Sequence, residues 1–178
     1  MKDANLVSTA LQLRWPWLQR SEVSKPWTSF HIRFNPQVLA LFREACCSVV
    51  GDGRSTLFWT DNWIDGRSIE SFAPVVFATV GRRTCHRRLV VDALVGSAWI
   101  HDISGPLNAQ GMAEFLQLAD TLVTMALVPG QEDVLRWRWS TSGVYFAKSA
   151  FLHFFEDRPT FPPWSQIWRC SAPLKCRI

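Results

Sequence analysis

The 178-residue chain lacks several features that would place it in a class at once. It has no run of about 18 apolar residues, the length of a membrane span, and no apolar block of signal-peptide type near its start. We therefore expect an intracellular protein, nuclear or cytoplasmic, that makes no contact with membranes. Its five cysteines are odd in number and should stay reduced there. Tyrosine occurs once against ten tryptophans and twelve phenylalanines, so large rigid rings should dominate the core.

Common catalytic motifs are also missing from the sequence. It contains no Gly-x-x-x-x-Gly-Lys-Ser/Thr phosphate loop, no Gly-x-Ser-x-Gly elbow and no His-Glu-x-x-His pair. The histidines are far apart and next to no obvious nucleophile: His31, His86, His101 and His153. We therefore expect no enzymatic activity and no cofactor.

The cysteine spacing does not favour a zinc site. Short Cys-x2-4-Cys or His-x3-5-His loops let two ligands turn onto one ion. Here the Cys/His pairs at 46–47 and 85–86 are adjacent, and five residues separate Cys170 from Cys176. We expect no bound metal, and Cys46 fits better as a small buried residue.

Three aspartates lie close together in sequence but do not indicate acid-base chemistry. Asp52 lies between two glycines and Asp65 precedes one, which is typical of turns. Asp61 lies between Trp59 and Trp63, and a buried carboxylate there needs a partner such as an arginine or an indole N–H.

Charge is arranged in blocks of alternating sign. The net charge is +3 over residues 1–50, −2 over 51–80, +3 over 81–100, −5 over 101–135 and +5 over 136–178. With 48% hydrophobic and 19% charged residues, the chain suits one globular domain with charged patches. Such patches meet phosphate or one another, and a single block is more often a solvated face.

Periodicity and turn residues predict an α+β fold. Asn35 and Pro36 start a helix over 36–50, and apolar stripes predict helices over 111–127 and 147–155. Residues 65–107 are expected to be loops, with a short strand or one helical turn near 89–94. The expected strands are 55–64, rich in aromatic residues, and a hairpin of 134–139 with 144–146. We thus expect a small antiparallel sheet packed by about three helices, with loosely packed termini.

The arginines favour binding of RNA or DNA without sequence preference. Guanidinium groups bind phosphate through a planar fork, and exposed rings stack on unpaired bases. The alternative interpretation is that the rings are core and the arginines ordinary surface. One group of candidate residues surrounds His86: Arg82, Arg83, Arg87 and Arg88. A second group lies on the predicted strand whose other face is tryptophan: Arg136 and Arg138.

A longer motif resembles a known family. Residues 51–66 resemble the Gly-Asp-Gly-x4-Phe-Trp-x-Asp-x-Trp-x2-Gly stretch that follows the polymerase in plant non-LTR (LINE-type) retrotransposon polyproteins. Residues 13–27 look like the segment before it, and 137–151 with 164–175 look like the start of the reverse transcriptase zinc-binding region. The residues of these motifs are Gly51, Asp52, Gly53, Phe58, Trp59, Asp61, Trp63, Trp137, Gly143, Lys148, Ser149 and Trp168.

The resemblance implies a fragment without catalytic parts. In the family the zinc ligands follow the point where this chain stops, and the polymerase lies upstream. It implies a peripheral segment (1–34), an α+β connector domain (35–157) and a linker with the truncated zinc-binding region (158–178). We expect a non-catalytic piece of a reverse transcriptase polyprotein whose partners are nucleic acid or the missing polymerase domain. The alternatives are an interaction module docking through a tryptophan face, tested at Trp137 and Trp168, or a non-functional remnant.

Overall fold

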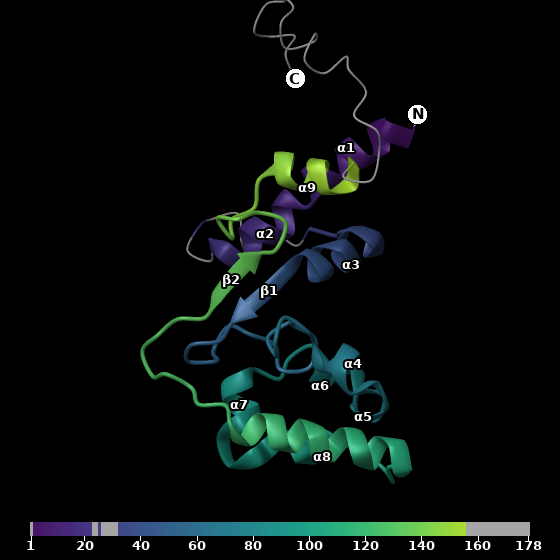
Figure 1. The fold of residues 1–178 in the computed structure, drawn as a ribbon, viewed down its shortest axis with the longest axis vertical. Coiled ribbons are helices and arrows are strands. Elements are labelled where there is room, and N and C mark those ends of the chain that lie inside the picture. The colour runs from purple at the N-terminus through teal and green to yellow at the C-terminus, as the bar shows by residue number, and fades with distance from the viewer. Residues whose placement is uncertain (1, 23–24, 26–31, 156–178) are drawn as a thin grey trace, which may run out of the picture.

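The computed structural model describes residues 2–22, 25 and 32–155. The predicted linker and zinc-binding start at 158–178, with Trp168, lie outside the described residues. Two groups of helices stack along the long axis of the molecule, and a two-stranded sheet connects them (Figure 1). In the described ranges, no helix is long and apolar enough to cross a membrane.

The first group begins with α1 (Lys2–Gln12), α2 (Arg14–Ser21) and α3 (Pro36–Ala45). Asn35 caps α3 as the sequence predicts, because its side-chain oxygen accepts a hydrogen bond from the Gln37 N–H at 2.9 Å. The predicted extent, 36–50, is too long. The helix ends at Ala45, and the next four residues form a strand.

The sheet pairs segments that are far apart in sequence. Strand β1 (Cys46–Val49) runs antiparallel to β2 (Val134–Trp137), with Cys46 opposite Trp137. The predicted hairpin is therefore wrong: residues 140–143 do turn, but 144–146 form no strand. The predicted strand at 55–64 is also wrong. Consecutive residues there, Phe58 and Trp59, are both buried, which a strand with one solvent face does not allow.

The expectation of about three helices, and of loops over 65–107, is wrong as well. Four- and five-residue helices fill much of that range, and they are too short for apolar periodicity to reveal them. Of the two alternatives predicted near 89–94, a short strand or a turn of helix, the structure has the helix, α7 (Val90–Leu94). The predicted helix over 147–155 is confirmed as α9 (Ala147–Phe155). The remaining helices are α4 (Ile69–Phe72), α5 (Pro74–Ala78), α6 (Arg82–Cys85), α7 (Val90–Leu94), the 3-10 helix η2 (Val95–Asp102), α8 (Ala109–Val123) and α9 (Ala147–Phe155).

Buried apolar residues form two clusters. The contiguous core comes from one stretch of chain: Phe58, Trp59, Trp63, Ile64, Ile69, Ala73, Val76, Val80, Cys85, Val90, Ala93, Trp99, Leu118 and Leu122. The split core comes from two distant stretches: Ala10, Leu13, Trp17, Val38, Phe42, Ala45, Cys46, Trp137, Tyr145 and Ala150.

The described N-terminal helices are not loosely packed. Leu13 is fully buried and Trp17 is 7% exposed, because α1 packs on α9 and α2 packs on α3. The Trp17 ring meets the Trp137 ring edge to face, with centroids 6.2 Å apart. Residues assigned to the periphery from the sequence therefore complete the split core.

Candidate nucleic-acid interface

The Gly-Asp-Gly loop encloses the carboxylate of Asp133, which immediately precedes β2. One carboxylate oxygen accepts hydrogen bonds from the N–H groups of Gly51 and Gly53, at 2.7 and 2.9 Å. The other accepts from Ser55 N–H and from the Thr56 hydroxyl, at 3.0 and 2.9 Å. The loop therefore behaves as an anion-binding nest whose occupant is a side chain of the same protein.

Both glycines of the loop are required by close approach of backbone. A Cβ on Gly51 would lie 2.2 Å from the Gln131 carbonyl oxygen, and Gly53 adopts φ +75° with the Val91 nitrogen 2.8 Å from its would-be Cβ. Burial alone would raise the pKa of Asp133, but its hydrogen bonds outweigh this and hold the pKa below its usual 3.8. The loop is thus a structural joint to β2.

Asp61 is buried and paired, as its position between tryptophans requires. The Arg20 guanidinium binds it through two hydrogen bonds of 2.9 and 2.6 Å, and Leu57 N–H donates a third at 2.8 Å. Because Arg20 lies on α2, this ion pair connects the first helices to residues 51–66, the motif loop. Asn62 adds to the tie by donating its amide N–H to the carbonyl oxygens of Arg43 and Cys46.

The motif tryptophans form the two cores. Trp59 is fully buried and donates its indole N–H to Asp102 at 3.0 Å, while Trp63 donates to the Phe58 carbonyl at 2.7 Å. In the split core, Trp137 is 1% exposed, and its indole N–H binds Ser149 at 2.9 Å. Their function is packing, with each polar N–H satisfied.

Two of the six candidate arginines are bound to other parts of the protein. Arg88 pairs with the buried carboxylate of Asp102, donating from Nε at 2.9 Å and from a terminal nitrogen. Arg138 donates to the backbone oxygen of Gly66 at 3.2 Å. Arg136 is exposed on β2, with its stem over Gly143. The alternation of Trp137 inward and its arginine neighbours outward is as predicted.

The other three arginines form an exposed cluster. Arg82 and Arg83 lie on α6, and Arg87 lies in the turn that follows. Helix α6 belongs to the helical group that holds α4 to α8 (Figure 1), whereas Arg136 lies on β2 and Arg138 directly follows that strand. The structure therefore divides the candidate residues into two groups on different elements. Lys148, on α9, is exposed as well.

Cysteine chemistry offers no second site in the part of the chain that the structure describes. No group of three or more metal-binding side chains is present there. Burial raises the pKa of Cys46 to about 12, although Arg20 opposes this shift. The Cys46 thiol therefore stays protonated at neutral pH and packs as a core residue, as expected.

Sequence reasoning missed the residues that organise the motifs. Asp133 and Asp102 are ordinary acidic residues in sequence: Asp133 is 82 positions from Gly51, and Asp102 is 43 positions from Trp59 and 14 from Arg88. Arg20 was not singled out either. The sequence signal for Arg20 is the need of Asp61 for a partner such as an arginine or an indole N–H, and that signal does not identify the residue.

Comparison with known proteins gives one distant relative. A curated Arabidopsis thaliana protein described as a "Putative ribonuclease H protein" is 26% identical over 125 residues. The match covers 68% of this chain and 18% of that protein, so the chain spans less than a fifth of its length. No protein-family model matches the chain, and no solved structure does. The chain thus has a distant, partial similarity to a plant protein described as a putative ribonuclease H protein.

Proposed function

We propose that this chain is a non-catalytic connector from a retroelement reverse transcriptase polyprotein and that it contacts RNA or DNA phosphates without sequence preference. The distant relation to a plant retroelement-type protein supports the origin. The ordered motifs of the sequence support a position between the polymerase and the zinc-binding region. The connector role rests on both.

The observation that carries the nucleic-acid contact is the exposure of Arg82, Arg83 and Arg87. Arg88 and Arg138 bind carboxylate and carbonyl oxygens of the protein itself. The three exposed guanidinium groups lie within six positions of one another and have their forks in solvent. Three phosphate contacts would give a modest, salt-sensitive affinity of the kind typical of non-specific binding.

A salt titration tests the proposal. Binding of the chain to a single-stranded RNA of mixed sequence is measured by fluorescence anisotropy. Each phosphate contact contributes a slope of about −0.7 in log affinity against log salt, so three contacts predict a loss of about 20-fold for a fourfold rise in salt. Changing Arg82, Arg83 and Arg87 to serine should remove most of the binding and the slope.

The matched control removes the same charge elsewhere. Arg14, Arg33 and Lys148 are also exposed, and they lie elsewhere in the chain: on α2, before α3 and on α9. Their triple serine variant should keep most of the affinity if the α6 cluster is the contact. Equal losses in the two variants would show a general charge effect and would refute the assignment to α6.

A second candidate function, docking of the polymerase domain, is favoured by one observation. Trp137 cannot serve as a docking residue because it is 1% exposed. Val7, Leu11 and Trp15, however, recur every four residues and are 39%, 56% and 44% exposed. If this stripe docks the polymerase, Trp15→Ser should abolish capture of the parent element's polymerase domain at high salt. Unchanged capture would remove this candidate.

A further inference from the structure

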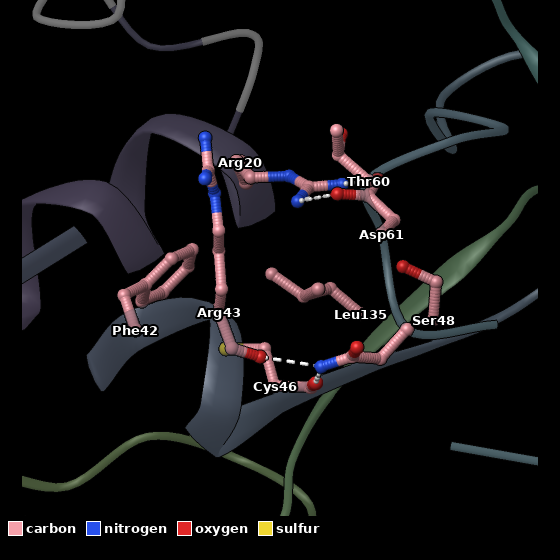
Figure 2. Close-up of a pocket in the computed structure, with 9 residues that line it drawn as sticks. Arg20, Phe42, Arg43, Cys46, Ser48, Thr60, Asp61 and Leu135 are labelled. Atoms are coloured by element: carbon pink, nitrogen blue, oxygen red, sulfur yellow. Dashed lines mark hydrogen bonds and ion pairs between the residues drawn. The ribbon is translucent and has the colours of Figure 1, made fainter. Parts of the chain in front are cut away.

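A small pocket lies at the junction of the two helical groups. Arg20 of α2 and Arg43 of α3 line it, together with Ser48 of β1, Leu135 of β2 and Asp61 of the motif loop. Figure 2 shows these side chains converging from four elements and the loop on one space. The pocket therefore forms only where α2, α3 and the sheet meet the motif loop.

Ser48 and Arg43 line the pocket with side-chain donor groups that have no acceptor among the described residues. Ser48 is 8% exposed, and its hydroxyl points into the pocket without a hydrogen bond to any described residue (Figure 2). The Arg43 guanidinium, which carries five N–H groups, forms no ion pair with the described residues. The Asp61 carboxylate already accepts three hydrogen bonds. The Arg43 guanidinium and the Ser48 hydroxyl can therefore donate hydrogen bonds to an anion at this pocket.

Charge and size narrow the choice of ligand. The two arginines and one aspartate that line the pocket give it a net charge of +1, which suits a singly charged group. The pocket encloses about 10 Å³, which is room for one water-sized atom. A base or a sugar does not fit, whereas one oxygen of a phosphate group does, with the rest of the group at the mouth beside Arg43.

We propose that this pocket is a phosphate site, in which one phosphate oxygen meets the Ser48 hydroxyl while Arg43 and the remaining N–H groups of Arg20 bind the others. The phosphate comes from a nucleic-acid backbone or from free phosphate. The site is separate from the α6 cluster and does not depend on it. It gives the connector a phosphate contact where its first helices meet the motif loop.

Thermal unfolding of the full chain tests the site. Inorganic phosphate and dimethyl phosphate are each compared with chloride at matched ionic strength. Both should raise the Tm of the wild-type chain, since a ligand that binds only the folded state stabilises it. Arg43→Gln should weaken the apparent phosphate affinity by about tenfold, the usual size of a lost charge-assisted hydrogen bond. Ser48→Ala should weaken it less.

Two control variants separate this proposal from the previous one. Arg33→Gln removes an exposed arginine outside the pocket and should keep the full rise in Tm. The variant in which Arg82, Arg83 and Arg87 are changed to serine should also keep the full rise in Tm. If that variant loses the rise while Arg43→Gln keeps it, the phosphate binds α6 and the pocket proposal is overturned, while the proposed function stands.

The two phosphate compounds identify the source. A rise with dimethyl phosphate supports a nucleic-acid backbone, and a rise with inorganic phosphate alone supports free phosphate. Either rise in Tm supports the site if Arg43→Gln weakens or removes that rise. No rise with either compound would mean that the pocket holds only water, which overturns the proposal.

Discussion

The two cores of this protein are assembled in different ways. The contiguous core draws all its residues from Phe58 to Leu122, so its contacts form within one stretch of chain. The split core needs residues near both ends, and its strands β1 and β2 are joined through the whole contiguous region. Loop closure over such a distance costs entropy that local contacts avoid. The split core should therefore depend on the contiguous core, and not the reverse.

The family-like motif lies where the two cores meet. Its glycine loop holds Asp133 at the entrance to β2, and its Asp61 holds Arg20 of α2. Asn62 binds the end of α3. Gly51, Gly53 and Asp61 thus join two structural units. The motif residues Phe58, Trp59 and Trp63 pack in the contiguous core.

Replacing one tryptophan in each core should have the largest effect. Trp59→Ala and Trp137→Ala each remove a fully packed ring and should cost about 3–5 kcal/mol in the free energy of unfolding. The dependence of one core on the other predicts that Trp59→Ala unfolds both cores, whereas Trp137→Ala unfolds only the split core. Hydrogen exchange of the Val90 and Ala93 amides reports the difference. Trp15→Ala, at an exposed ring, is the control and should cost little.

Removing the carboxylate that fills the glycine loop should come next. Asp133→Ala leaves the N–H groups of Gly51 and Gly53 without their acceptor and should cost about 3 kcal/mol. Urea unfolding measures the loss. The neighbouring Glu132→Ala, at an exposed position, should change stability by less than about 0.5 kcal/mol. Similar effects of the two changes would show that the loop does not need Asp133.

Breaking the ion pair between α2 and the motif loop should have a smaller effect. Arg20→Gln leaves buried Asp61 with one of its hydrogen bonds and no cation, at a cost of about 2 kcal/mol. Arg54 and Asp52 form an exposed pair at 3.7 Å, and Arg54→Gln should cost less than about 0.5 kcal/mol. Chemical denaturation of both variants checks this ranking. A larger loss for Arg54→Gln would contradict it.

Acid should weaken the joint through Asp133. Its folded-state pKa is lowered, so the stability it contributes is present above the unfolded-state pKa of about 4 and is lost as pH falls through the folded value. The wild-type chain should therefore lose more stability than Asp133→Asn between about pH 4.5 and the folded pKa. Parallel pH profiles of the two proteins would contradict the assignment.

Sequence reasoning found the elements with a long period or a clear cap. Asn35 and Pro36 mark the start of α3, and the alternation around Trp137 identifies β2. It failed where tertiary contacts decide. Strand β2 pairs with β1, not with 144–146, because Trp137 and Cys46 pack into the same core. The aromatic content of residues 55–64 favours a strand, but in the structure these residues form bends and turns. The turns allow Phe58, Trp59 and Trp63 all to be buried.

The candidate site was predictable only in part. The exposure of Arg82, Arg83 and Arg87 could be predicted, because several like charges close together in sequence favour contact with solvent. The internal partners of Arg88 and Arg138 do not, because Asp102 and the Gly66 carbonyl reach them only through the fold. The Arg20–Arg43 pocket depends on four elements meeting, which no local pattern encodes.

Native-state hydrogen exchange of the wild-type chain tests the relation of the two cores most directly. The amides of Val90 and Ala93, bonded within the contiguous core, should exchange only at the highest opening free energies. The amides of Trp137 and Arg138, bonded in the split core, should exchange at clearly lower ones. A single common value for both sets would show one cooperative unit and would contradict the account.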